Sequence, residues 1–110
     1  MIERALLVGA YIDHGEKNDA ESLLEELEEL VNTLGVPVMR RMLVHYRENH
    51  ARYLIGSGKA EEIAAIVKEE KLDSIIFDNE LTPAQQRNWE KLTGVTVIDR
   101  HEVILDIFAQ

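Results

Sequence analysis

The residues best suited to binding an anion are four consecutive ones: Gly56, Ser57, Gly58 and Lys59. They open a segment with helical spacing. Free N–H groups at a helix start, the helix dipole and a lysine all favour a negative charge, so phosphate or an RNA backbone would fit. They do not form a P-loop, because Tyr53 stands where the first glycine belongs and Ala60 replaces the hydroxyl that would bind magnesium. In the alternative interpretation the glycines only turn the chain and the lysine is solvated.

A second candidate is a positively charged segment on a negatively charged chain. The sequence holds 12 Lys and Arg against 21 Asp and Glu, and this net charge of −9 argues against a generic nucleic-acid-binding surface. Residues 40–52 are the exception, with four arginines against a single glutamate: Arg40, Arg41, Arg47 and Arg52. With His45 and Tyr46 between them, these arginines are able to hold phosphates and unpaired bases of RNA. The alternative is an exposed strand edge whose charges prevent edge pairing, and composition does not decide between the two.

The remaining polar residues predict neither catalysis nor a metal site. Four carboxylates near predicted loops match no calcium loop or two-carboxylate signature: Asp78, Glu80, Asp99 and Asp106. The four histidines show no H-E-x-x-H spacing, and the chain has no cysteine. Ser57 lacks a G-x-S-x-G setting. We therefore expect structural roles for the acids, no catalytic residue and no bound metal or cofactor in this chain.

Alternating strands and helices must position these candidates. Short apolar runs predict strands, and apolar residues three or four positions apart predict helices. The predicted strands are residues 5–9, 36–44, 74–78 and 95–98, and the predicted helices are residues 18–34, 58–71, 83–92 and 99–110. Because the connections are too long for hairpins, right-handed crossovers between parallel strands are favoured. The sequence thus predicts one small three-layer α/β domain over residues 1–110, with a mostly parallel sheet of four to five strands flanked by helices.

Local signals mark the helix ends. Asn18 or Asp19 is predicted to cap the first long helix, whose inward residues would be Leu23, Leu27, Leu30, Val31 and Leu34. Thr82 and Gln85 form a capping-box pattern, and Asp99 is predicted to open the last helix. Two glycines are predicted to end helices: Gly35 and Gly94. Residues 45–52 remain open between a hairpin tip and an irregular crossover loop.

The end of the sequence and its apolar content bear on context. The last predicted helix reaches Gln110 without Gly, Pro or a basic terminator, so we expect the natural protein to continue, and this helix to support self-association. The longest apolar runs are about five residues, against the roughly 20 that a membrane helix needs. The lack of cysteine fits a reducing compartment. We expect no membrane partner and a cytoplasmic location.

Four strings, in order along the chain, carry a family resemblance. They are YLIGSGK at residues 53–59, FDNELTPAQQRN at residues 77–88, VIDR at residues 97–100 and ILDIFAQ at residues 104–110. With their spacing, they resemble the N-terminal domain of HflX-type GTPases, from about Arg4 to the chain end. The resemblance implies a cytoplasmic protein that binds the large ribosomal subunit and helps to split or rescue stalled ribosomes. It also implies a helical linker and a GTPase domain after this one, with GTP and Mg²⁺ bound there.

The resemblance favours one function over two alternatives. No G-x-x-x-x-G-K-[ST] and no Asn-Lys-x-Asp motif occurs in the 110 residues, so GTP hydrolysis is not assigned to them. We predict a non-catalytic ribosome-binding domain that contacts large-subunit RNA through the four arginines, helped by Lys59. The first alternative is an independent module that binds or hydrolyses ATP or GTP at residues 56–59. The second is a domain that mainly regulates its neighbouring GTPase by docking against it.

Overall fold

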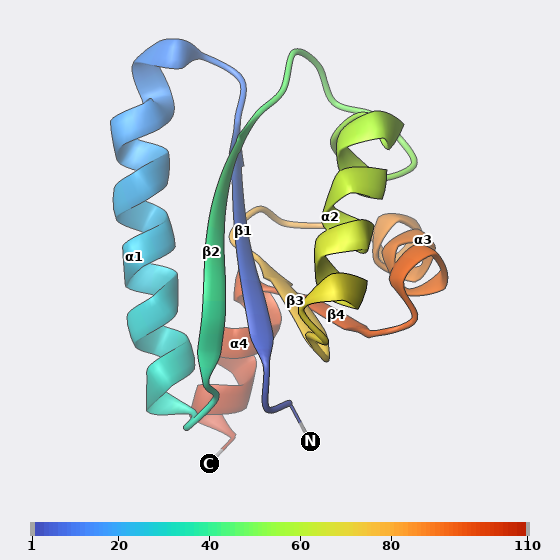
Figure 1. Cartoon of the computed structure of the whole chain (residues 1–110). Coiled ribbons are helices and arrows are strands. Elements are labelled where there is room, and N and C mark those ends of the chain that lie inside the picture. Colours follow the sequence, from blue (N-terminus) through green and yellow to red (C-terminus); the bar gives the residue numbers. More distant parts are fainter. Residues whose placement is uncertain (1, 110) are drawn as a thin grey trace.

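The protein forms a four-stranded parallel sheet between two layers of helices, as a computed structural model of residues 2–109 shows (Figure 1). The strands are β1 (Ala5–Tyr11), β2 (Val38–His45), β3 (Ser74–Phe77) and β4 (Thr96–Asp99), in the order β2-β1-β3-β4. The helices are the 3₁₀ turn η1 (His14–Glu16), α1 (Lys17–Thr33), α2 (Ser57–Glu69), α3 (Pro83–Thr93) and α4 (Arg100–Phe108). All three strand pairs are parallel, so the predicted α/β class and its parallel sheet are confirmed.

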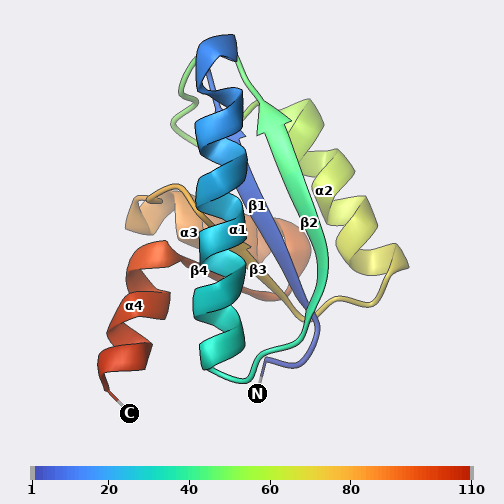
Figure 2. The same ribbon diagram turned by 90° about the vertical axis from the view of Figure 1, so that its left-hand side faces the viewer.

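Helices cover both faces of the sheet, and the central strand β1 is buried between them. Helices α1 and α4 lie on one face, and α2 and α3 lie on the other (Figures 1 and 2). Leu6 and Val8 of β1 belong to the core under α2 and α3, whereas Ala5 and Leu7 belong to the core under α1 and α4. Successive side chains of a strand point to opposite faces, which explains why β1 is an uninterrupted apolar run.

Helix α1 begins differently from the prediction. Neither Asn18 nor Asp19 is its cap, because the helix starts at Lys17 directly after η1, and Asp13 caps that turn by accepting a hydrogen bond from the Gly15 N–H. The inward face is also shifted. Leu27 and Val31 are buried as predicted, but the third buried residue is Leu24, and Leu23 is 44% exposed. Adjacent leucines made the two faces indistinguishable in the sequence.

The other helix ends follow their local signals. Thr82 and Gln85 form a complete capping box at α3, and Gly94 ends that helix in the left-handed conformation. Asp99 caps α4, and its carboxylate accepts a hydrogen bond from the Glu102 N–H. Helix α4 ends at Phe108, and Gln110, where the helix was expected to continue, lies outside the described residues. The predicted caps of α3 and α4 are thus confirmed.

Candidate functional site

In open parallel sheets the usual ligand position lies beyond the carboxyl ends of the strands, where the chain reverses its winding direction. Here that position lies between β1 and β3, and the Asn79 side chain closes it. Asn79 accepts a hydrogen bond from the Ala10 N–H at 2.8 Å and donates one to the Ala10 carbonyl at 2.9 Å. The adjacent cavity of about 240 Å³ is lined by three carboxylates, those of Glu16, Asp19 and Asp78. These charges would repel a phosphate, so this position is not suited to a nucleotide.

The strand-end acids serve the fold. Asp78 accepts a hydrogen bond from Arg100 Nε at 2.6 Å, and the same guanidinium also donates to the Leu23 carbonyl and to Glu26. Arg100 therefore ties the start of α4 to β3 and α1. Asp99 accepts hydrogen bonds from the Leu81 and Glu102 N–H groups. Within residues 2–109, no cluster of three or more His, Asp or Glu side chains is arranged to hold a metal ion.

The candidate site that remains is the crossover loop, residues 46–56, which links the end of β2 to the start of α2 on the opposite face (Figure 1). It is an irregular crossover loop and not a hairpin tip. It contains one tight turn, in which His50 and Leu54 exchange two backbone hydrogen bonds of 2.9 and 2.8 Å. The turn lies at the carboxyl end of the sheet, where the helices start.

Three side chains of α3 hold the backbone of the crossover loop. Gln85 donates to the His50 carbonyl at 3.1 Å. Two more donors follow on the same helix: Asn88 donates to the carbonyl of Arg52 at 3.1 Å, and Trp89 donates to that of Tyr53 at 3.0 Å. These bonds show a role for the string at residues 77–88 that sequence reasoning did not find, because they join residues 35 or 36 positions apart.

Backbone strain and burial also fix this turn. Leu54 has a φ of +71°, a left-handed conformation that costs a residue with a side chain about 1–3 kcal/mol. The strain persists because Tyr53, Leu54 and Ile55 are all buried, and the Tyr53 and Trp89 rings pack edge to face at 5.4 Å. Strained and over-determined backbone of this kind is concentrated at functional sites. The crossover loop is thus a rigid platform.

The predicted RNA-contacting arginines fall into two groups. Arg47 and Arg52 are exposed on the crossover loop, and the Arg52 guanidinium lies 5.3 Å from the centre of the Tyr53 ring. Arg40 and Arg41 lie on the edge strand β2, where consecutive side chains point to opposite faces of the sheet. The structure therefore does not bring the four together at one place.

The two arginines of β2 are each paired with a carboxylate. Arg40 pairs with Glu70 at the end of α2, and Arg41 pairs with Glu28 of α1 at 2.7 Å. These pairs are partly exposed, so each is worth little to stability, but each lowers the charge available to a polyanion. The exposed arginines of the crossover loop are better placed for such a partner.

Residues 56–59 form the N-terminal end of α2, next to the crossover loop. Ser57, Gly58 and Lys59 are exposed, and Lys59 Nζ lies 2.9 Å from the Glu62 carboxylate. Gly56 has an ordinary φ of −61°, and a Cβ built on Gly58 would meet no atom within 4 Å. The fold therefore does not require glycine at either position.

A cluster of rings, which sequence reasoning did not assemble, lies beside the crossover loop. His45 at the end of β2 pairs in register with Tyr11 of β1, and their rings are 5.3 Å apart. The His14 ring stacks on His45 at 4.1 Å, with 17° between the planes. Tyr46, the residue after His45, donates a hydrogen bond from its hydroxyl to Asn49. Burial and the charge of Glu16 raise the pKa of the Tyr46 hydroxyl. His14 and His45 lie in different elements, η1 and β2, so only the tertiary arrangement brings their rings together.

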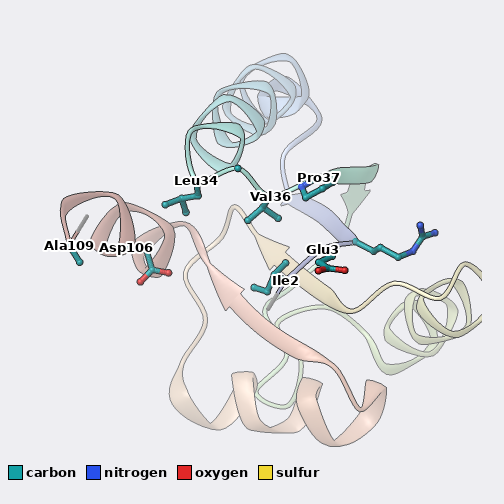
Figure 3. A pocket seen from close by; sticks show the side chains of 9 residues that line it. Ile2, Glu3, Leu34, Val36, Pro37, Asp106 and Ala109 are labelled. Atoms are coloured by element: carbon teal, nitrogen blue, oxygen red, sulfur yellow. The ribbon is translucent and has the colours of Figure 1, made fainter.

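The opposite end of the sheet carries an apolar groove of about 940 Å³ between the ends of α1 and α4 (Figure 3). Its lining residues are Ile2, Glu3, Arg4, Leu34, Gly35, Val36, Pro37, Asp106 and Ala109. On α4 near this groove, Leu105 and Phe108 are 53% and 83% exposed. Self-association through the end of α4 stays a prediction.

No helix among residues 2–109 has the length and apolar character needed to cross a membrane.

Comparison with known families defines the class of this domain. A family described as "GTP-binding GTPase N-terminal" matches residues 21–109. The chain belongs to this family, the N-terminal domains of HflX-type GTPases. The resemblance carried by the four strings is therefore confirmed.

Two relatives give the particular proteins that it resembles. The chain is 46% identical over 110 residues to the GTPase HflX of Akkermansia muciniphila. It is 43% identical over 108 residues to the GTPase HflX of Escherichia coli (strain K12). The two matches include 100% and 98% of this chain but only 25% of each relative. The chain thus spans about a quarter of the length of these GTPases.

Solved structures show the same fold at low sequence identity. A GTP-binding protein from the hyperthermophilic archaeon Sulfolobus solfataricus, in complex with GDP, matches with a TM-score of 0.61 and 20% identity, over 98% of this chain and 30% of that chain. The C-terminal catalytic domain of ISC1926 TnpA, an IS607-like serine recombinase, matches with a TM-score of 0.62 and 13% identity, over 96% of this chain and 78% of that chain. At these identities the likeness concerns the fold alone.

Proposed function

We propose that this domain binds RNA of the large ribosomal subunit through the crossover loop, within an HflX-like GTPase that splits or rescues stalled ribosomes in the cytoplasm. The observation that carries the proposal is the rigid turn that presents Arg52, with Arg47 on the same loop. Because α3 already holds the backbone around Arg52, little backbone entropy is lost when this side chain binds. Lys59 at the start of α2 is a further cation at the same end of the sheet, but its pairing with Glu62 at 2.9 Å lowers the charge that it offers.

In this proposal the domain is a binding and regulatory unit without chemistry of its own. GTP hydrolysis, with GTP and Mg²⁺, belongs to a G domain joined by a helical linker outside these 110 residues. The overall charge of −9 limits the RNA contact to a local surface. Arg47 and Arg52, two exposed arginines on one loop that form no ion pair within residues 2–109, give such a surface.

The test compares two matched double variants, Arg47→Ser with Arg52→Ser and Arg40→Ser with Arg41→Ser. Co-sedimentation of each variant with purified large ribosomal subunits is measured over a range of salt concentrations. We expect the loop variant to bind about tenfold more weakly, with a log–log salt slope that is flatter by about 1.5, because about two phosphate contacts are lost. The β2 variant should change both quantities less, since those arginines are paired with Glu70 and Glu28. Unchanged binding in the loop variant would refute the RNA contact.

A second candidate is the independent nucleotide-binding module, and the glycines at positions 56 and 58 favour it, since the fold itself does not require them. Titrating the domain with ATP and GTP while following the amide signals of residues 56–59 separates the two functions. Saturable shifts there would support nucleotide binding. Absent or linear shifts, together with the salt-dependent subunit binding above, would support the RNA-binding domain.

A further inference from the structure

Three rings at the carboxyl ends of β1 and β2 form a ladder, in the order Tyr11, His45, His14. The Tyr11 and His45 rings are tilted by 54° at 5.3 Å, and the His45 and His14 rings are nearly parallel at 4.1 Å. Tyr11 is half-buried, and His45 and His14 are exposed, so the ladder runs from the sheet towards solvent. His14 is its outer end.

The two histidines are held in place by the backbone around them. His45 Nε2 lies 2.9 Å from the Ile12 carbonyl, which sets the orientation of its ring. The η1 turn that carries His14 is closed by Asp13, whose carboxylate accepts from the Gly15 N–H at 2.9 Å and whose carbonyl accepts from the Glu16 N–H at 2.8 Å. No residue of η1 is buried, and one face of the His14 ring stacks on His45.

We propose that an unpaired RNA base stacks on the outer face of His14 and extends this ladder by one ring. The inference rests on the proposed RNA-binding function and names the form of RNA that it requires. Proteins hold single-stranded RNA by stacking splayed bases on aromatic side chains, His among them. A base inside a duplex has both faces covered, so the ladder selects single-stranded or looped RNA.

The charges around His14 restrict where the phosphates of a bound nucleotide can lie. Asp13 and Glu16 flank it on the same turn, and their carboxylates would repel a phosphate group. The first cation of the crossover loop, Arg47, follows His45 by two residues. The phosphates of a nucleotide whose base lies on His14 therefore have to lie away from Asp13 and Glu16.

The experiment measures binding of the 110-residue chain to fluorescently labelled oligoadenylate and oligouridylate of equal length. Purines stack more strongly than uracil, so the wild-type chain should bind oligoadenylate more tightly. His14→Ala should weaken oligoadenylate binding about tenfold and remove this preference, whereas His14→Tyr should keep it. The matched control is His101→Ala, an exposed histidine in the first turn of α4 that is outside the ladder, and it should change neither affinity. Thermal unfolding of each variant checks that the fold is retained.

The outcomes separate this inference from the function on which it rests. If His14→Ala keeps the preference for oligoadenylate, or weakens both oligonucleotides equally, base stacking on His14 is overturned while RNA binding stands. Arg47→Ser should weaken both oligonucleotides equally, since it removes charge and not a ring. If the wild-type chain binds neither oligonucleotide, base stacking on His14 is overturned, and the co-sedimentation test decides separately whether the domain binds large-subunit RNA.

Discussion

The two ends of the sheet use their polar groups in opposite ways. At the carboxyl end, side chains of α3 hold the carbonyls of the crossover loop, and the charged side chains of that loop point outwards. At the amino end, Arg4 donates to the carbonyls of Glu70 and Lys71, and Asp73 accepts from two N–H groups near the N-terminus. Polar groups there are used within the fold, and an apolar groove remains. One end thus exposes charged side chains on a held loop, and the other exposes an apolar groove.

The largest expected effect is on the free energy of unfolding and concerns the side-chain packing at the carboxyl end of the sheet. Trp89→Ala should lower the free energy of unfolding by about 3–5 kcal/mol, because Trp89 is fully buried, contacts the rings of Tyr53 and Phe77 and donates to the crossover loop. Chemical denaturation measures the loss. The matched aromatic at the other end is Phe108, which is 83% exposed, and Phe108→Ala should change stability by less than about 0.5 kcal/mol. Similar losses in both variants would remove the contrast between the two ends.

A smaller, pH-dependent effect is expected at the amino end. Burial alone would raise the pKa of Asp73, but hydrogen bonds from the Arg4 and Glu3 N–H groups and the Ser74 hydroxyl outweigh it and lower the pKa below 3.8. A carboxylate whose pKa is lowered by folding adds stability above its unfolded pKa, and this is lost as pH falls through the folded value. Asp73→Asn should cost about 1 kcal/mol at neutral pH.

The control for Asp73 is the exposed Asp106→Asn, which should be nearly neutral throughout. The deficit of Asp73→Asn should shrink as the pH falls below 3.8, the ordinary pKa of an Asp carboxyl, and vanish once the pH is below the lowered pKa of the folded protein. A deficit that stays constant in urea denaturation from neutral to acid pH would show that the charge of Asp73 does not hold the N-terminal residues.

The smallest expected effect is a gain in stability. Gly58→Ala places a Cβ in open space at the start of α2, and it should raise the free energy of unfolding by about 0.5 kcal/mol, because Ala loses less backbone entropy than Gly. Binding to large subunits should weaken if the partner approaches this backbone closely. Gly94→Ala is the matched control and should lower stability by about 1 kcal/mol, because Gly94 has a φ of +72°. A stabilised Gly58→Ala that binds normally would remove residues 56–59 from the proposed contact.

Much of the fold was predictable because its signals are local. The capping box of Thr82 and Gln85 and the left-handed Gly94 each depend on residues within a few positions. The inward face of α1 was not predictable, because Leu23 and Leu24 are adjacent and only the packing of α1 against β1 shows which of them is buried.

The candidate site was predictable in composition but not in arrangement. The sequence indicates an arginine-rich segment, yet the pairing of Arg40 with Glu70 joins residues 30 positions apart. The bonds from α3 to the crossover loop and the stacking of His14 on His45 likewise depend on which strands and helices become neighbours. Local patterns carry no information about such contacts.

The position of β1 in the sheet sets the order in which the chain is able to fold. This first strand lies at the centre, where Ala5 pairs with Val38 on one side and with Ser74 on the other. During synthesis the β3 side of β1 therefore stays unpaired until about seventy residues have been made. Contacts this distant along the chain slow folding, and the exposed apolar edge is open to aggregation in the meantime. Translation pauses before β3 emerges should therefore lower the yield of native protein.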